Sequence, residues 1–334
     1  MFNFYIATNI IYVSIAIILD FILGDPSWFP HPIIYIGKLI SALENYFRKI
    51  TKDCESLKVY GGLIVIIVGL LTFTIPYFLL KLSLINIYLF HILNIFIIWT
   101  TIAAKSLDKA GTEVYKSLQA DDLETARLKL SYIVGRDTKN LSKTDIIRAD
   151  IETIAENTSD GVIAPIFYGI IGGAPLAMMY KGINTIDSML GYLTEKYKCI
   201  GFYPAKLDDL FNLIPARLTG ILICLSSPIV KGNIINSFKI MIRDRKNHKS
   251  PNSAYPEASV ASAIKIQLGG TNIYFGEKIY KPSIGDNNKA LEYNDIIKAI
   301  ILMYSSEILL IIMVLIFLLF VIGMVYQLQF FDFH

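Results

Sequence analysis

Long apolar runs limit what this chain can fold into more than any other feature of its sequence. Four segments, at about residues 6–23, 62–80, 82–104 and 300–326, carry almost no charge. Each is long enough to cross a bilayer, because a helix of roughly 20 residues spans the hydrocarbon. A helix also satisfies its own backbone hydrogen bonds in lipid. The sequence therefore predicts an all-α, polytopic helical membrane protein with about four full spans, forming one domain over residues 1–334.

The distribution of basic residues predicts how these spans are oriented. Only Lys81 separates the second span from the third, which indicates an antiparallel helical hairpin with its turn at that residue. Basic residues gather after the first span, from Lys38 to Lys58, and after the third, from Lys105 to Arg148. By the positive-inside rule both polar segments are cytoplasmic and both chain ends are outside. We expect a multi-pass protein of the cell membrane, in contact with the lipid bilayer and with long cytoplasmic helical loops.

The composition supports a membrane protein and gives no indication of a nucleic-acid-binding protein. The 334 residues are 54% hydrophobic and 18% charged, with a formal net charge of +3, which is typical of a membrane protein. So small a charge, without a zinc-finger, RNA-binding or basic-zipper pattern, predicts no nucleic-acid partner. Cys54, Cys199 and Cys224 have no metal-ligand spacing and are odd in number, so we expect three reduced cysteines with no special role.

Two further apolar segments, 161–179 and 213–230, are long enough to span but are interrupted. The interruptions are Pro165 and Gly172-Gly173-Ala174-Pro175 in the first, and Pro215, Arg217, Gly220 and Pro228 in the second. The region after both segments is basic and therefore expected to be cytoplasmic, so either both cross the membrane or neither does.

A near-repeat favours a re-entrant first segment. Asn157-Thr158-Ser159-Asp160 precedes it and Asn184-Thr185-Ile186-Asp187 follows it. The two motifs can serve one site only if the segment enters the membrane and returns, with Gly-Gly-Ala-Pro at its tip. Non-helical backbone at that depth is tolerated where protein or water surrounds it. The alternative is two unrelated helix caps, since Asn, Thr and Asp favour such positions.

The stretch from Ser142 to Asp160 is predicted to be an amphipathic helix that ends at this segment. Ser142 and Asp145 form a plausible capping box, and one face carries the apolar stripe Ile147, Ile151 and Ile154. Glu152, Glu156 and Asp160 follow one another at one-turn spacing on the opposite face. Arg148 is a candidate partner for Glu152, whereas Glu156 and Asp160 repel each other unless a cation lies between them. A surface helix with a solvated acidic face is the alternative.

Acidic and amide side chains gather around the two Asn-Thr-x-Asp motifs. They are Glu152, Glu156, Asp160, Asp187, Asp208 and Asp209, with Asn157, Asn184 and Asn212. Oxygen ligands without paired cysteines suit Mg²⁺ rather than zinc. Basic residues near them in sequence are Arg136, Arg148, Lys181, Lys206 and Arg217. Acids together with Arg and Lys are what a Mg²⁺–phosphate site requires, although no Walker A loop is present. Ordinary ion pairs at helix ends explain part of this set equally well.

Seven short motifs, taken together and in order, resemble the CobD/CbiB family. They are Leu23-Gly24-Asp25-Pro26 with His31-Pro32, Val134-Gly135-Arg136-Asp137, Glu156-Asn157-Thr158-Ser159-Asp160, Asn184-Thr185-Ile186-Asp187, Leu207-Asp208-Asp209-Leu210, Pro215-Ala216-Arg217-Leu218, and Ser250-Pro251-Asn252 with Pro256-Glu257-Ala258. Each motif alone is weak, but seven in order are specific.

The resemblance implies an enzyme of cobalamin biosynthesis, adenosylcobinamide-phosphate synthase. In that family aminopropanol, or its phosphate, is joined to the free propionate carboxylate of the corrinoid adenosylcobyric acid, and ATP is consumed. This chemistry agrees with the acidic and basic residues, because a carboxylate reacts with an amine only after its oxygen becomes a leaving group. Phosphorylation by ATP would supply an acyl phosphate, with Mg²⁺ holding the phosphates.

We therefore assign hypothetical roles to the motif residues. Glu156, Asp160 and Asp187 are expected to bind Mg²⁺ with its nucleotide, and Glu156 also to act in catalysis. Asp208 or Asp209 is expected to deprotonate the incoming amine. Phosphate or propionate groups are assigned to Arg136, Lys181 and Arg217, and further substrate or nucleotide contacts to Asn157, Asn184, Asn212, Asn252 and Glu257.

Two other functions fit parts of the pattern. Interrupted helices with polar residues at membrane depth are typical of transporters. A structural scaffold for other membrane enzymes of the corrinoid pathway would also contain such helices. The long polar loops that hold most of the candidate residues favour the enzyme.

Overall fold

The structure, a computed structural model, describes residues 2–26, 28–192, 194–274 and 277–331. Helices form most of this part of the chain, and a single antiparallel hairpin of β1 (Gln267–Tyr274) and β2 (Glu277–Gly285) is the only sheet in it. The all-α membrane fold is confirmed, since six helical segments are long and apolar enough to cross a membrane. The β-hairpin was not predicted from the sequence.

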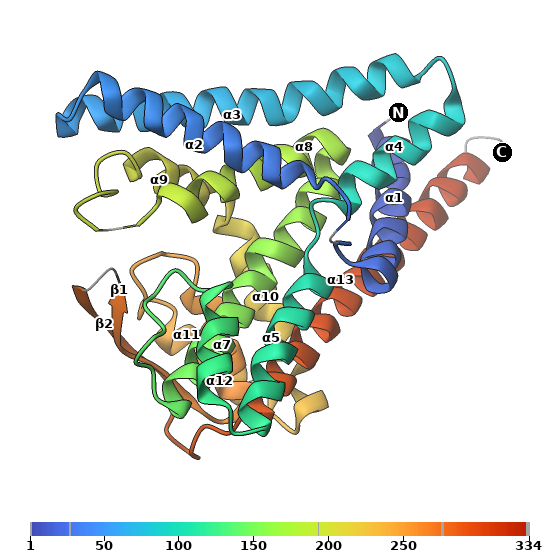
Figure 1. The fold of residues 1–334 in the computed structure, drawn as a ribbon. Helices are drawn as coiled ribbons and strands as arrows, with labels where there is room; N and C mark the ends of the chain where they lie inside the picture. The colour runs from blue at the N-terminus through green and yellow to red at the C-terminus, as the bar shows by residue number, and fades with distance from the viewer. Residues whose placement is uncertain (1, 27, 193, 275–276, 332–334) are drawn as a thin grey trace.

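The long apolar helices lie along two directions. Helices α1 (Phe2–Leu23), α4 (Ile87–Trp99) and α13 (Asn294–Phe331) run side by side at the right of Figure 1, and α1 contacts both others. Helices α2 (Pro32–Ile50) and α3 (Cys54–Ser83) lie together along its upper edge, where they cover α8 (Ala164–Leu190) and α9 (Phe202–Phe211). The polar helices and the β-hairpin gather at the opposite end.

The boundaries predicted for the second and third spans are wrong. Helix α3 continues through Lys81 to Ser83, and the turn falls just before Asn86, whose side chain accepts from the first turn of α4. Helix α4 stops at Trp99, and α5 (Ala104–Gln119) begins as a separate helix. The interruption has a tertiary cause, because the Ala103 N–H donates to the Gly161 carbonyl at 2.9 Å instead of continuing its own helix.

The acidic helix forms as the sequence predicts, and the apolar segment after it reverses direction, as a shared site for the two Asn-Thr-x-Asp motifs requires. Helix α7 (Lys143–Asn157) begins with a complete Ser142–Asp145 capping box, passes through the π-helical segment η1 (Thr158–Ile163), and continues into α8. A straight helix would separate Asp160 from Asn184 by about 36 Å, yet Asn184 Nδ2 lies 3.5 Å from Asp160 Oδ2. The chain therefore reverses at Gly173, whose φ of +65° breaks the helix.

The second interrupted segment is more regular than predicted. Helix α10 (Leu213–Ser226) is continuous through Pro215 and Gly220, and only Pro228 changes it, to the 3₁₀ turn η2 (Ser227–Val230). Pro215 lies in the first helical turn, where a backbone N–H has no partner to lose. Gly220 serves packing, because a Cβ there would lie 2.8 Å from the Met241 sulfur.

The remaining helices enclose the polar end. They are α6 (Leu123–Ser131), α11 (Ile234–Asp244) and α12 (Ala254–Ile264). One hydrophobic core joins α1, α4, α5, α7, α12 and α13, and the stripe Ile147, Ile151 and Ile154 of α7 is buried in it. A second core packs α2 and α3 on the connection between α8 and α9. Helix α7 is thus held between other helices and is no solvated surface helix.

The prediction of three reduced cysteines is wrong for two of them. Cys54 and Cys199 form a disulfide, while Cys224 is free and buried in α10. The bonded pair is 145 residues apart, so its formation depends on how α3 packs against the α8–α9 connection. That packing is close, since a Cβ at Gly61 of α3 would lie 2.0 Å from the Ile200 carbonyl oxygen.

Candidate functional site

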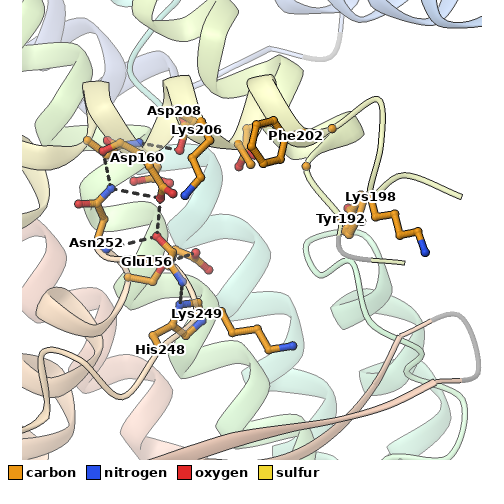
Figure 2. A pocket seen from close by; sticks show the side chains of 18 of the residues that line it. Glu156, Asp160, Tyr192, Lys198, Phe202, Lys206, Asp208, His248, Lys249 and Asn252 are labelled. Atoms are coloured by element: carbon orange, nitrogen blue, oxygen red, sulfur yellow. Dashed lines mark hydrogen bonds between the residues drawn. The ribbon is translucent and has the colours of Figure 1, made fainter. Parts of the chain in front are cut away.

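An acidic cavity of about 450 Å³ lies where α7, η1, α8, α9 and the loop before α12 converge (Figure 2). Five carboxylates line this cavity: Glu156, Asp160, Asp187, Asp208 and Asp209. They are the five acids that were assigned to metal binding or catalysis from the sequence. The reversal of α8 is what joins them, because it returns Asn184 and Asp187 to the end of α7. From here on we call this space the acidic cavity.

Amide side chains hold the deepest two acids together. Asn184 Nδ2 donates to Asp208 Oδ1 at 3.2 Å and lies 3.5 Å from Asp160 Oδ2. Asn212 Nδ2 donates to Asp208 Oδ2 at 3.0 Å, and Asn212 itself accepts from the Tyr180 hydroxyl at 2.8 Å. Burial raises the pKa of Asp208 to about 6 despite the two amide donors. This carboxylate is therefore mostly ionised at neutral pH but is a stronger base than an exposed aspartate.

The Ser250-Pro251-Asn252 loop is attached to the other acids. The Ser250 hydroxyl donates to Asp209 Oδ1 at 2.9 Å, and Asn252 Nδ2 donates to the Asp209 carbonyl at 2.8 Å. The Ser253 hydroxyl donates to Glu156 Oε1 at 2.8 Å. Burial raises the pKa of Asp209. The loop thus joins α9 to α7 and closes one side of the acidic cavity.

Basic side chains line the same cavity, and most of them were not identified from the sequence. They are Lys198, Lys206, His248, Lys249 and Lys281, of which only Lys206 was singled out. Figure 2 shows Lys206 beside Asp208, and Lys249 and His248 below Glu156. The basic run before Ser250 was a usable signal for His248 and Lys249. Lys281 comes from β2, and nothing in its local sequence points to the site.

The chemistry of the donors fits Mg²⁺, with one restriction. Carboxylate and amide oxygens are suitable ligands, and Asp160 and Asp187 form no ion pair with a basic residue in the described part of the chain. However, no three acidic, histidine or cysteine side chains of that part lie close enough together to hold a metal ion by themselves. Mg²⁺ commonly retains waters and uses one or two carboxylates with substrate phosphates, and the acidic cavity fits that mode of binding.

Some residues assigned to binding lie outside the cavity. Asn157 donates to the Thr153 carbonyl of its own helix at 3.0 Å. Arg217 is 3.2 Å from Asn252 Oδ1, and its guanidinium lies 4.6 Å from the centre of the Tyr255 ring. Arg217 therefore supports the Ser-Pro-Asn loop from behind, while Asn252 itself lines the cavity.

The partner predicted for Glu152 is wrong. Arg136 Nη2 pairs with Glu152 Oε2 at 2.6 Å, with both side chains buried, and the Gly269 N–H donates to Glu152 Oε1 at 2.9 Å. Arg148 pairs instead with Asp145, three residues before it. The 3.6-residue period places Arg148 near Glu152 but says nothing of Arg136 on another segment. Arg136 thus lies behind the cavity wall and not in it.

Glu257 is not among the residues that line the acidic cavity. It is 1% exposed, and neither of its carboxyl oxygens has a hydrogen-bond partner among the described residues. Burial raises its pKa to about 8, so its carboxyl is mostly neutral at pH 7. Lys181 is separated from the other assigned cations as well, since it lines a second cavity with Asp25 and His31.

Comparisons with known proteins agree on one family. The family model described as CobD/Cbib protein matches residues 13–303. A protein of Clostridium tetani, named cobalamin biosynthesis protein CobD, is 60% identical over 91% of this chain and 96% of its own length. A Clostridium acetobutylicum protein of the same name is 62% identical over 90% and 95%. Cobalamin biosynthesis protein CbiB of Salmonella typhi is 44% identical over 88% and 92%. No solved structure gives a significant match.

Proposed function

This chain belongs to the CobD/CbiB family and takes part in cobalamin biosynthesis, and from that premise we propose that it is an ATP-dependent amide ligase. It would join an aminopropanol-type amine to the free propionate carboxylate of adenosylcobyric acid. The single observation that supports the proposal most is the acidic cavity, in which five carboxylates and five basic side chains face one space. Such a combination suits a Mg²⁺–nucleotide beside a carboxylate substrate.

The proposed reaction has two steps. The propionate oxygen attacks the terminal phosphorus of ATP, ADP leaves, and an acyl phosphate forms. The amine nitrogen then attacks the acyl carbon, the carbon–nitrogen bond forms, and inorganic phosphate leaves. Mg²⁺ would neutralise phosphate oxygens during the first step. One or two of the carboxylates of Glu156, Asp160 and Asp187 would hold it together with waters and phosphate oxygens, and the lysines that line the cavity would contact the remaining phosphate charge.

Asp208 is the better of the two candidates for accepting the amine proton. Its pKa of about 6 leaves it ionised at neutral pH, and its amide contacts fix its orientation. Asp209 contacts the Ser-Pro-Asn loop through both its carboxylate, at Ser250, and its carbonyl, at Asn252, so its contacts favour a role in holding that loop. General-base catalysis of this kind contributes roughly a hundredfold or more to the rate.

The test uses purified protein in detergent with adenosylcobyric acid, ATP and aminopropanol phosphate. We expect the corrinoid amide product, with one ADP released for each amide. If the propionate oxygens carry ¹⁸O, one labelled oxygen should appear in the released phosphate, because it passes through the acyl phosphate. Asp160→Asn and Asp187→Asn should each abolish turnover, since a lost ligand charge removes several kcal/mol of transition-state stabilisation.

Three results would reject the ligase. Corrinoid uptake into vesicles without ATP turnover would favour a transporter. Full activity of both aspartate variants would remove the metal-binding role of the acidic cavity. A protein that supports the pathway in cells although its acids are replaced would be a scaffold for the other membrane enzymes.

A further inference from the structure

Helix α10 and the turn η2 that follows it carry an exposed apolar stripe. Ile221, Leu225 and Ile229 are spaced four residues apart, so they lie above one another on one face, and all three side chains are exposed. Because α8 reverses at Gly173, the first interrupted segment returns to the side it came from, and parity then predicts that α10 does not cross the membrane either. A full membrane span therefore does not explain this stripe.

Helix α11 carries a second apolar stripe, in which Ile235 and Ile242 are exposed. A short turn joins η2 to α11, so α10 and α11 run in opposite directions. They contact each other at Gly220 and Met241, since a Cβ at Gly220 would lie 2.8 Å from the Met241 sulfur.

The two stripes lie on the same side of this helix pair. Ile221 follows Gly220 by one residue, and Ile242 likewise follows Met241. In antiparallel helices, an equal rotation away from a shared contact leads to the same side of the pair. We call the resulting surface the α10–α11 face, and its exposed members are Ile221, Leu225, Ile229, Ile235 and Ile242.

The α10–α11 face lies beside a helix that is predicted to cross the membrane. Both α10 and η2 contact α13, and the exposed apolar side chains of α13 begin at Ile301 and continue through Ile308 and Ile312. A contiguous exposed apolar surface marks contact with a membrane or with another protein. The neighbouring span favours the membrane.

Exposed lysines border the face, and the protein does not neutralise their charges. They are Lys231, Lys239 and Lys246, which form no ion pair with any described residue. Lys239 lies one helical turn from both Ile235 and Ile242. The segment from residue 231 to residue 249 has a single acid, Asp244, which is buried and pairs with Arg243. The border that this segment forms is therefore cationic.

Exposed apolar side chains bordered only by basic ones are typical of a helix that lies in the interface of an anionic bilayer. Contact with another protein would not require every border charge to be basic, whereas anionic headgroups do. We propose that the α10–α11 face docks on the cytoplasmic surface of the membrane. Its apolar side chains enter the boundary between headgroups and acyl chains, and its three lysines contact the phosphates of anionic phospholipids.

Docking would fix one wall of the acidic cavity relative to the membrane. The Gly285 N–H at the end of β2 donates to Asp244 Oδ2 of α11 at 2.8 Å, and β2 also carries Lys281 into the cavity. His248 and Lys249, which follow α11, line the cavity as well. The docking surface goes beyond the proposed function and does not depend on the ligase reaction.

The test uses a fluorophore sensitive to its environment, nitrobenzoxadiazole, on single cysteines of the full-length protein. The background is Cys54→Ser/Cys199→Ser, in which the remaining Cys224 is buried. Labels are placed at Ile221→Cys on α10 and Ile235→Cys on α11, with Leu128→Cys on α6 as the matched control, because Leu128 is apolar and 52% exposed. The protein is held in phosphatidylglycerol nanodiscs that contain a nitroxide lipid, with its quencher either near the headgroup or near the bilayer centre.

We expect the quencher near the headgroup to lower the fluorescence at positions 221 and 235 by about twofold or more, as for a helix at the acyl boundary. The quencher at the bilayer centre should act less, and position 128 should respond to neither. In phosphatidylcholine nanodiscs the quenching at position 235 should be weaker. The triple variant Lys231→Gln/Lys239→Gln/Lys246→Gln should remove this difference between the two lipids.

Three outcomes would overturn the docking surface. An unquenched label at position 235 in phosphatidylglycerol would show that water or another protein covers α11. Strongest quenching of position 221 from the bilayer centre would show that α10 crosses the membrane. Equal quenching in both lipids, unchanged in the triple variant, would remove the role of anionic phospholipid. The assay contains no ATP or corrinoid, so none of these results bears on the ligase proposal.

Discussion

Two glutamates one turn apart on α7 have different environments. Glu152 is fully engaged by Arg136 and the Gly269 N–H, and both members of the ion pair are buried. Glu156 faces the acidic cavity, and among the described residues its carboxylate accepts a hydrogen bond from Ser253 alone. Their helical positions are equivalent, so periodicity alone treats them alike. The contacts assign Glu152 to stability and Glu156 to the site.

Glu156→Gln is therefore expected to lower turnover by at least about a hundredfold, the scale of one preorganised charge contact, with little change in melting temperature. Glu152→Gln should instead destabilise the protein by about 3–5 kcal/mol, because it leaves the buried Arg136 uncompensated. The comparison requires the turnover rate and the melting temperature of both variants. Equal activity losses, or a markedly unstable Glu156→Gln protein, would contradict it.

The second prediction at this scale concerns Glu257 and pH. Its folded pKa, about 8, lies above the unfolded value, so the folded protein holds this proton more tightly. The stability it gives is complete below about pH 4.5 and is lost as the pH rises through 8. The slope approaches ~1.4 kcal/mol per pH unit within that window. Glu257→Gln should remove this slope, as measured by denaturation between pH 5 and pH 9, and an unchanged slope would refute the assignment.

At the scale of elements, the reversal within α8 creates the site. Gly173 adopts a φ of +65°, and a Cβ there would lie 3.2 Å from Asn9 Oδ1. Asn9 of α1 in turn donates to the Ile170 carbonyl at 3.2 Å. The tip of the re-entrant segment is therefore held by α1, and the position requires glycine for its backbone.

Gly173→Ala is expected to destabilise the protein by about 1–3 kcal/mol, the cost of a backbone conformation with positive φ and extended ψ that is open essentially to glycine alone, and to lower turnover by displacing Asn184 from Asp160. Gly69→Ala is the matched control. Gly69 lies within α3, where a Cβ meets nothing within 4 Å, so alanine should be neutral or slightly stabilising. The melting temperature and the turnover rate of both variants test this prediction. A Gly173→Ala protein as stable and active as the control would show that the reversal does not depend on this residue.

At the scale of the whole molecule, the basic segments and the disulfide favour different orientations of the protein in the membrane. The basic segments predict, by the positive-inside rule, that the acidic cavity and the α8–α9 connection lie in the cytoplasm, where the nucleotide of the proposed reaction is available. The Cys54–Cys199 disulfide lies on the same connection, and disulfides persist mainly in oxidising compartments. The most informative measurement of topology is therefore the side of the membrane on which the α8–α9 connection lies.

We expect Glu195→Cys, in a Cys54→Ser/Cys199→Ser background, to be protected from a membrane-impermeant thiol reagent in intact cells. Glu195 is exposed in the α8–α9 connection, so lysed cells should label readily and serve as the control. Ready labelling of intact cells would place the connection outside. Both interrupted segments would then cross the membrane, and the positive-inside assignment would be wrong.

The sequence by itself determined whatever depends on neighbours along one helix. Apolar length predicted the membrane helices, although not where the second and third begin and end, the Ser142–Asp145 box predicted the start of α7, and the paired Asn-Thr-x-Asp motifs predicted a reversal at Gly172-Gly173-Ala174-Pro175. These features follow from a helical period and from local hydrogen bonds, which a short stretch of chain contains completely.

Only the tertiary structure decided which distant groups meet. It paired Glu152 with Arg136 instead of Arg148, brought Lys281 from a β-strand into the acidic cavity, and joined Cys54 to Cys199. It also placed Lys181 in a second cavity, apart from the acidic cavity. These outcomes depend on how whole helices pack. Where two partners are far apart in sequence, that packing decides whether they meet, and the spacing within either segment does not reveal it.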